Sequence, residues 1–299
     1  MVGRPIVILL HHRDMRFESS GYLLHRLTQY WQAQGTRVRF LRGRRWGVRA
    51  EVVLPHLDLT VRPAAYQAYL DRFPCVLNRS LTSIAKSAFS RQLLRADDPY
   101  TGPVIIKTDR NYAGVPEQIL AQPRPFRWLD PTTIMDMVQR RLPGYRTPVI
   151  ESDPLRYHNY AIYPNLRAVP PEVFQDPAWV VEEYLPECVD GLYYLRFTYV
   201  LGLRHITLEI HSDQPIAKGA NSLACREVET PAEILDRARA LGMDFGKLDH
   251  ARHEGRLVLY DINPTPSSRT FFNHFGVYDR VVEQLAPGLE AFRSGHASG

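Results

Sequence analysis

The sequence predicts an α/β protein that begins with a small parallel lobe. Two observations carry this prediction: strand and helix patterns alternate through residues 1–79, and hairpin patterns replace them after residue 190. Alternating strands and helices are typical of a parallel sheet, and hairpins are typical of antiparallel sheets. With 299 residues, of which 44% are hydrophobic and 23% charged, the chain can bury a large core and has the composition of a globular protein.

The elements of the N-terminal lobe follow one another at short intervals. The apolar run "PIVILL" at residues 5–10 predicts a buried first strand, because it is too short for the core of a signal peptide or for a membrane span. Ser19–Gly35 has a serine that can cap a helix, helical apolar spacing and a closing glycine, which together predict a helix. Further strands are predicted at residues 36–41, 50–60 and 74–79, with a helix at 64–73. We therefore expect a first domain over residues 1–79.

The middle of the chain is less regular. Amphipathic spacing predicts a helix at Ser80–Arg95, and a compact apolar run predicts a strand at Pro103–Lys107. Residues 115–178 are a proline-rich insert, for which loops and short helices are expected. "WVVEEYLPE" at residues 179–187 then predicts a strand that runs into an acidic bend.

The C-terminal part contains two predicted hairpins separated by a helix. Tyr193–Ile210 is expected to turn at Gly202, and Pro231–Gly242 has helical spacing. The second hairpin is Lys247–Asn263, and residues 288–299 are expected to form a frayed tail.

The second hairpin places oxygen ligands close together. Asp261 and Asn263 share a face because they are two apart on a strand. Asp249 joins that face if the turn holds an odd number of residues, and a three-residue turn ending in a left-handed Gly255 satisfies this. Such a turn sets Lys247 opposite Asp261. A two-residue turn would place the aspartates on opposite faces unless the strand contains a bulge.

These side chains suggest a magnesium site. Mg²⁺ favours carboxylate and carbonyl oxygens and usually shares its coordination shell with substrate phosphates, which the lysine would also contact. The alternative is a surface hairpin with scattered polar residues, and the spacing alone leaves both interpretations open.

The order of these motifs resembles the ATP-grasp superfamily, the fold of D-alanine–D-alanine ligase and glutathione synthetase. The resemblance runs over roughly Ser80–Arg269. It implies two α+β lobes that clamp ATP, at residues 80–182 and 183–287.

The resemblance also implies roles for individual residues. "KLD" and "DINPTP" fit the family's Asp strand and acidic-x-Asn-x-x-Pro motif, which bind two Mg²⁺ ions, with Mn²⁺ expected to substitute. This assigns Asp249, Asp261 and Asn263 as metal ligands, although Asp261 stands where Glu is commoner. The implied catalytic residues are Lys247, which would contact phosphate or the reaction intermediate, and Arg196, which would face the acyl phosphate or the substrate. The implied nucleotide-binding residues are Lys86, Lys107, Gly114 in a phosphate-covering lid, Glu182, Glu183, Leu185, Glu187, Lys218 and Asn221.

The function that the resemblance implies is ATP- and Mg²⁺-dependent ligation of a small carboxylate to an amine, through an acyl phosphate and with release of ADP. One alternative is a kinase that phosphorylates a small molecule and stops there. Another is a pseudoenzyme that only holds nucleotide or binds RNA through its basic segment.

Charge and cysteine content indicate which binding partners and which compartment to expect. The net charge is +5, and Arg37–Arg49 contains six arginines that could attract nucleic acid, phosphates or acidic substrates, or simply form a solvated loop. Three distant cysteines do not predict a disulfide framework, so a reducing cytoplasm is expected. No membrane association is expected, and a homodimer is compatible with the sequence.

Overall fold

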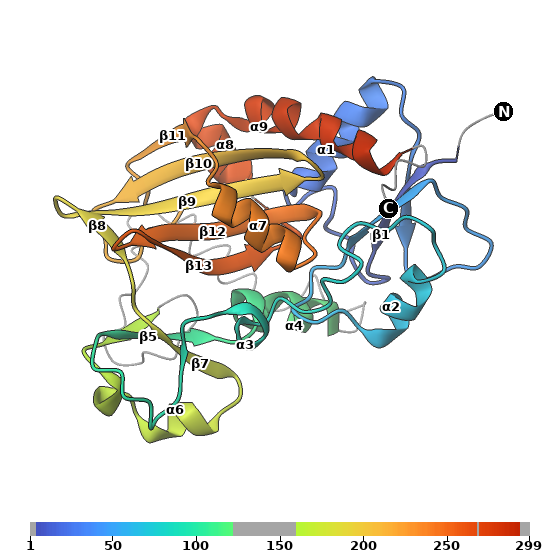
Figure 1. Cartoon of the computed structure of the whole chain (residues 1–299). Coiled ribbons are helices and arrows are strands. Elements are labelled where there is room, and N and C mark those ends of the chain that lie inside the picture. The colour runs from blue at the N-terminus through green and yellow to red at the C-terminus, as the bar shows by residue number, and fades with distance from the viewer. Residues whose placement is uncertain (1–3, 122–159, 268, 294–299) are drawn as a thin grey trace, which may run out of the picture. The chain divides into compact units, whose positions relative to one another are not determined.

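The computed structural model describes residues 4–121, 160–267 and 269–293. The chain divides into two compact units (Figure 1), which are Met1–Gln92 with Leu185–Gly299, and Leu93–Tyr184. Most of the predicted insert, residues 122–159, and the end of the predicted tail, residues 294–299, lie outside the described residues. The units combine helices with parallel and antiparallel sheets, which confirms the α/β class.

Three parallel strands open the first unit. β1 (Ile6–Leu10) lies between β2 (Val38–Arg42) and β3 (Val52–His56). Every residue of β1 and β3 is buried, as expected for parallel strands covered on both faces. The predicted parallel lobe is confirmed.

Two helices pack against opposite faces of this sheet. Ile6 and Ile8 share a core with α1 (Leu23–Ala33), whereas Val7 and Leu9 share one with α2 (Ala64–Leu70). Successive strand residues point to opposite faces, so one apolar run serves both cores.

Two predictions between residues 74 and 95 are wrong, the strand at 74–79 and the helix at Ser80–Arg95. Residues 74–79 form only a single bridge, Val53 with Val76, and Asn78 has a left-handed φ of 52° because its side chain bonds the backbone of Asp244 and Phe245. The predicted helix at Ser80–Arg95 is reduced to the four-residue α3 (Lys86–Phe89) and the two-residue β4 (Leu93–Leu94).

Backbone pairing explains the lost helix. Arg62 N donates to Thr82 O at 2.8 Å, and Ile84 N donates to Thr60 O at 2.8 Å. These bonds hold the segment extended, so a non-local pairing outweighs its local helical spacing.

A six-stranded antiparallel sheet dominates the rest of the first unit (Figure 1). Its order is β11 (Ala224–Val228), β10 (Arg204–Ser212), β9 (Leu192–Leu201), β12 (Phe245–His253) and β13 (Arg256–Asn263), and β8 (Glu187–Val189) pairs with β9. The β9–β10 hairpin turns at Gly202-Leu203, which confirms the predicted turn.

Helices cover both faces of this sheet. One face packs in a single core with α1, α8 (Arg269–Phe275) and α9 (Tyr278–Leu285), and the other packs with α7 (Ala232–Ala240). The segment predicted as a frayed tail begins inside the 3-10 helix η4 (Ala286–Phe292), where Leu289 is buried. A Cβ at Gly288 would lie 2.0 Å from Leu201 O, so only glycine fits there.

The second unit is built on a four-stranded antiparallel sheet. Its order is β4, β7 (Trp179–Glu183), β5 (Val104–Thr108) and β6 (Ala161–Tyr163). The strands at 103–107 and 179–187 were both predicted. The other elements among the described residues of this unit are η1 (Asn111–Gly114), α4 (Val115–Ala121), η3 (Leu166–Ala168) and α6 (Pro171–Gln175).

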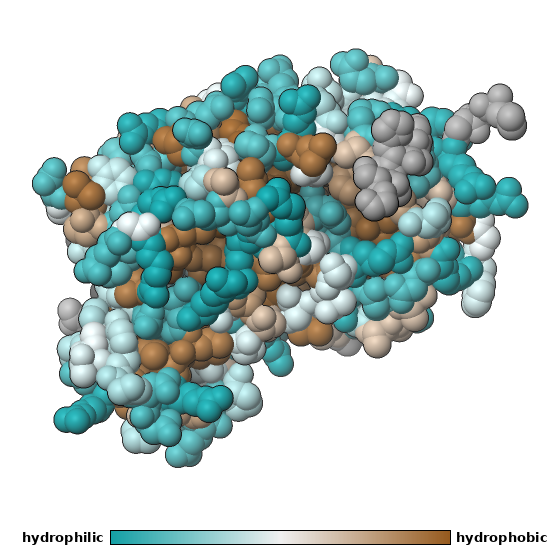
Figure 2. Space-filling view, in the orientation of Figure 1, coloured by the Kyte–Doolittle hydropathy of each residue, from teal (hydrophilic) through white to brown (hydrophobic). Residues whose placement is uncertain are grey.

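Figure 2 shows that hydrophilic side chains cover most of the visible face and interrupt its apolar patches. Large exposed apolar side chains are scattered, with Trp46 at 87% and Leu203 at 86% exposure the most prominent. No helix within the described ranges has the length and apolar character needed to cross a membrane.

Candidate active site

The β12–β13 hairpin gathers four of the predicted site residues on one face. Lys247 lies opposite Asn263, and Asp249 lies opposite Asp261. Directly opposed residues of an antiparallel pair share a face, and residues two apart on a strand do too. The predicted grouping is therefore present, and we call these four side chains together with Lys86 the carboxylate face.

The route to this register differs from the predicted one. His253 pairs with Arg256, so the turn contains two residues, Glu254 and Gly255, both with positive φ (50° and 80°). A bulge at Tyr260 adds one residue to β13 and restores the shared face. The predicted three-residue turn, and with it the predicted pairing of Lys247 with Asp261, is wrong.

Charges alternate across the carboxylate face. Lys247 Nζ donates to Asp249 Oδ2 at 2.9 Å and lies 2.8 Å from Oδ1, and Lys86 Nζ lies 3.7 Å from Asp261 Oδ1. The Lys86 side chain is only 5% exposed, so its ammonium is held near Asp261 rather than in bulk water. Each carboxylate thus has a lysine partner that a phosphate could compete for.

Burial raises the pKa of Asp249, Lys247 lowers it and the charge of Asp261 raises it, and the net result is a pKa of about 6. Two carboxylates at this spacing repel one another, and a cation near both would relieve that repulsion. Within the described residues, Oδ1 of Asp249 makes no hydrogen bond, since Lys247 Nζ is at ion-pair distance but poorly aligned.

The donor set fits a hard cation. Among the residues that the structure describes, no group of three or more His, Cys, Asp or Glu side chains is arranged to hold a metal ion. Asp249 and Asp261 nonetheless supply two carboxylates, and Asn263 supplies a carbonyl, which are the ligands that Mg²⁺ prefers. Oδ1 of Asn263 already accepts from N and Oγ1 of Thr265, at 2.8 and 3.1 Å. As a metal ligand it would have to give up one of these bonds.

A cavity of about 810 Å³ adjoins the carboxylate face. Lys247 lines it, and its Nζ lies 4.5 Å from the centre of the Phe197 ring. The other polar residues that line the cavity were not assigned individually from the sequence, among them Ser19, Ser20, Ser222, Arg269 and His274. They come from separate loops and α8; Ser19 and Ser20 end the polar loop after the first strand, and Arg269 lies close to the "DINPTP" motif, which are the signals that the sequence offers.

Arg196 is not brought to the carboxylate face. It lies opposite His250 and Glu209, one residue out of phase with Phe197 and Asp249, and so on the other face of the sheet. There it forms two hydrogen bonds with Glu187, at 2.5 and 2.9 Å, and an ion pair with Glu209 at 2.6 Å.

Glu187 is also engaged within the sheet. Besides Arg196, its carboxylate accepts from the backbone N of Arg252 at 2.5 Å. Burial raises the pKa of Glu187, but these bonds and charges outweigh burial and lower it overall. A ribose hydroxyl would have to replace one of these donors.

Asn221 organises the loop between β10 and β11. Its Oδ1 accepts from Lys218 N at 2.7 Å, and its Nδ2 donates to Gln214 and to the backbone of Ile216, each at 2.9 Å. Burial lowers the pKa of Lys218. The structure thus pairs the two predicted residues, with Asn221 positioning Lys218. Leu185 O accepts from Tyr260 Oη at 2.5 Å, which ties the predicted hinge to the bulge.

The remaining predicted residues belong to the second unit. Lys107 Nζ lies 2.6 Å from Glu182 Oε2, and both side chains are buried. Glu183 follows at the end of β7. Gly114 (φ 75°) closes η1 after Tyr112 and Ala113, which also have positive φ, so the predicted lid is a tight left-handed turn.

Three solved structures are similar to most of the chain. D-alanine–D-alanine ligase from Bacillus anthracis is 11% identical, with 97% of this chain and 99% of that chain covered and a TM-score of 0.46. Macrocyclase MdnC from Microcystis aeruginosa MRC, bound with precursor peptide MdnA, is 11% identical, with 94% and 97% covered and a TM-score of 0.46. The RiPP-associated ATP-grasp ligase of Chryseobacterium gregarium, in complex with ADP and a leader and core peptide, is 11% identical, with 94% and 95% covered and a TM-score of 0.47. No protein-family model and no curated protein matches the sequence.

Proposed function

We propose that the chain is an ATP-grasp ligase that uses ATP and Mg²⁺ to join a carboxylate to an amine. The observation that carries this proposal is the grouping of Lys247, Asp249, Asp261 and Asn263 on one face beside a cavity. A site of this composition suits transfer of a phosphoryl group to an anion, because the negative charges of both reactants must be neutralised.

Asp249, Asp261 and Asn263 would hold the magnesium. When bound, Mg²⁺ supplies neutralising charge to the phosphate oxygens. Lys247 and Lys86 are placed to exchange their carboxylate partners for phosphate oxygens, since each lies within 4 Å of a carboxylate that the metal would occupy. Relief of the Asp249–Asp261 repulsion favours that exchange.

The nucleotide roles implied by the resemblance belong to the same proposal. Lys107 and the turn at Gly114 would contact phosphates, with Glu182 holding Lys107 in place. Backbone groups of Glu183 and Leu185 would meet adenine, and Glu187 the ribose. Lys218, positioned by Asn221, would contact phosphate or substrate, and Arg196 would support Glu187 rather than face the reacting atoms.

The cavity beside Lys247 is the proposed acid site. Lys247 and Arg269 offer cationic groups, and Ser19, Ser20 and Ser222 offer hydroxyl donors. Donors of this kind bind carboxylates. The acid would receive the γ-phosphoryl group there, giving an acyl phosphate and ADP, and the amine would then displace phosphate.

The test is release of ADP and inorganic phosphate with a panel of amino acids, small carboxylates and peptides. We expect a carboxylate to stimulate Mg²⁺-dependent ADP release and, with hydroxylamine present, to yield a hydroxamate, because hydroxylamine traps an acyl phosphate. ADP formation with a stable phosphorylated product and no inorganic phosphate would instead show a kinase and overturn the ligase proposal.

A further inference from the structure

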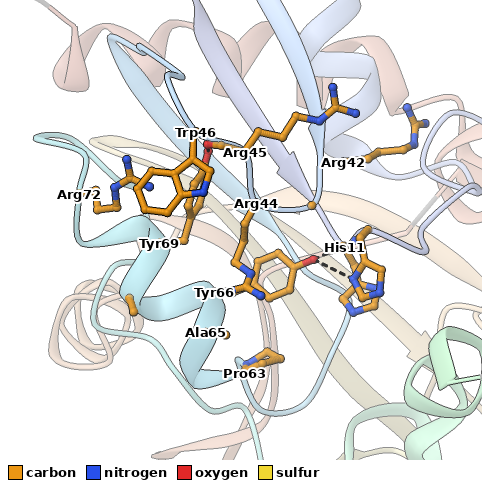
Figure 3. A pocket seen from close by; sticks show the side chains of 13 residues that line it. His11, Arg42, Arg44, Arg45, Trp46, Pro63, Ala65, Tyr66, Tyr69 and Arg72 are labelled. Atoms are coloured by element: carbon orange, nitrogen blue, oxygen red, sulfur yellow. Dashed lines mark hydrogen bonds between the residues drawn. The ribbon is translucent and has the colours of Figure 1, made fainter.

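A second cavity, of about 780 Å³, lies on the parallel sheet of the first unit (Figure 3). It is bounded by the ends of β1 and β2 and by α2. His11 and His12 follow β1, the loop Gly43–Trp46 follows β2, and α2 supplies Tyr66 and Tyr69. We call it the arginine cavity.

The lining of this cavity is strongly cationic. It includes Arg42, Arg44, Arg45 and Arg72, and no Asp or Glu is among the described residues that line it. Arg42 is ion-paired with Glu18. The guanidinium groups of the other three have no carboxylate within 4.0 Å in the described part of the chain, and these are the charges available to an anion.

Aromatic rings position two of these guanidinium groups. Arg44 lies 5.9 Å from the centre of the Tyr66 ring, and Arg72 lies 4.4 Å from Trp46 and 5.5 Å from Tyr69 (Figure 3). Stacking on a ring orients a guanidinium without using its N–H donors. The N–H groups of both guanidinium groups therefore remain able to bind phosphate oxygens.

Hydrogen bonds connect the segments that line the cavity. Tyr69 Oη donates to Arg45 O at 2.7 Å, which ties the β2 loop to α2, and His12 N donates to Tyr66 Oη at 2.9 Å. The platform is thus formed before any ligand arrives, and a preorganised site loses less entropy on binding.

Trp46 indicates what the ligand carries besides an anionic group. Its side chain is 87% exposed, although tryptophan is a residue that proteins usually cover. Arg72 stacks on the ring and leaves most of the indole to solvent. An exposed indole among arginines is the combination that binds a nucleobase by stacking and its phosphate by charge.

We propose that the arginine cavity binds a nucleoside phosphate, either free or as a unit of a single-stranded nucleic acid. Arg44 and Arg72 contact the phosphate, and Trp46 stacks on the base. The volume suits one such unit, since ligand cavities measure roughly 300–1,000 Å³. This site lies at the C-terminal ends of β1 and β2 and involves none of the residues of the carboxylate face.

Fluorescence anisotropy of the full chain with a labelled oligouridylate of about ten nucleotides tests this proposal. The Arg44→Ala/Arg72→Ala double variant and Trp46→Ala should each weaken binding about tenfold or more, and Trp46→Phe should retain most of it. The matched control is Arg39→Ala/Arg49→Ala, which removes two exposed arginines of the same segment that do not line the cavity, and which should change the affinity less than threefold or so.

Competition separates the two sources and tests the chemical class. Displacement by uridine monophosphate, lost in the Arg44→Ala/Arg72→Ala variant, would support a free nucleotide, and displacement by oligouridylate alone would support a nucleic acid strand. Equal weakening in the two arginine double variants would overturn the cavity as the site. Displacement by polyglutamate as effective as that by oligouridylate would overturn the nucleoside phosphate in favour of an acidic peptide.

Discussion

The carboxylate face and the arginine cavity belong to the same unit but balance their charges in opposite ways. On the carboxylate face each acid has a lysine, with Lys247 at 2.8 Å from Asp249 and Lys86 at 3.7 Å from Asp261. Opposite charges permit burial, because each compensates the lost hydration of the other. Ligand binding there means exchange of partners.

In the arginine cavity only Arg42 has a carboxylate partner among the described residues, whereas Arg44, Arg45 and Arg72 have none there. Arg44 and Arg72 rest on aromatic rings and remain exposed to water, which hydrates them. Ligand binding there means addition of a missing anion. Substitutions on the carboxylate face should therefore alter both chemistry and local electrostatics, whereas those in the arginine cavity should alter binding alone.

Asp261→Asn is expected to have the largest effect. It removes one of the two carboxylates that would hold Mg²⁺, and it leaves Lys86 without its counter-ion. Mg²⁺-dependent ADP release, measured with the stimulating carboxylate, should fall by roughly 100-fold or more with the fold preserved. Asp236→Asn changes an exposed aspartate of α7 in the same way and should leave the rate unchanged. Near-native turnover of Asp261→Asn would remove that residue from the metal site.

Lys107→Ala breaks a compensated pair of the second unit. Glu182 is 2% exposed, and one of its oxygens has no hydrogen-bond partner in the described part of the chain, so loss of the lysine leaves a buried carboxylate without a counter-ion there. We expect the free energy of unfolding, from urea titration, to fall by about 3 kcal/mol, and MgATP affinity to weaken.

A double variant separates these two effects. Lys107→Met with Glu182→Leu removes both charges and should restore most of the stability but not the affinity for MgATP. Restored affinity would contradict the phosphate role of Lys107.

His56 shows a third way of handling a buried charge, which is to remain neutral. Its ring is buried beside Phe17 and Tyr22, neither ring nitrogen has a hydrogen-bond partner among the residues that the structure describes, and burial lowers its pKa from 6.5 to about 3. The unfolded chain binds a proton on His56 more tightly than the folded chain does. The neutral, buried His56 therefore contributes its full share of folding stability above pH 6.5, and this share is lost as the pH falls toward 3.

His56→Leu should remove that dependence while keeping a buried side chain of similar size. The difference in unfolding free energy between the native chain and the variant should change by about 1.4 kcal/mol per pH unit between pH 6 and about 4. Urea titrations across this range measure it, and parallel curves would contradict a neutral buried His56.

Arg44→Ala should have the smallest effect on stability. The side chain is exposed and loses only one cation–π contact, so the free energy of unfolding should fall by about 0.5 kcal/mol or less. Urea titration beside Lys107→Ala tests the contrast directly. A loss as large as that of Lys107→Ala would show that the arginine is structural.

Local patterns predicted the elements that depend on local hydrophobic spacing. β1, α1 and the β9–β10 hairpin were found this way, because burial of one face imposes a period on the sequence. The helix predicted at Ser80–Arg95 failed, because Thr82 and Ile84 make backbone bonds to a segment twenty residues away or so, which no local pattern records.

In the candidate site, too, the features set by local sequence were predicted and those set by distant contacts were not. The hairpin motif held Asp249, Asp261 and Asn263 together, and parity predicted their shared face although the turn and the bulge at Tyr260 differ from expectation. Parity counts only the sum of extra residues, so an odd turn and an even turn with one bulge are equivalent. The ion pairs of Arg196 depend on cross-strand register, and the cavity depends on loops distant in sequence, so neither could be predicted.

Calorimetric titration with a non-hydrolysable ATP analogue tests the central claim most directly, because it needs no knowledge of the acid or the amine. The proposed site predicts binding to the native chain that requires Mg²⁺, that is lost in Asp261→Asn, and that persists in Asp236→Asn. Equal affinity with and without Mg²⁺, or unchanged affinity in Asp261→Asn, would contradict the assignment of the carboxylate face as the site of MgATP.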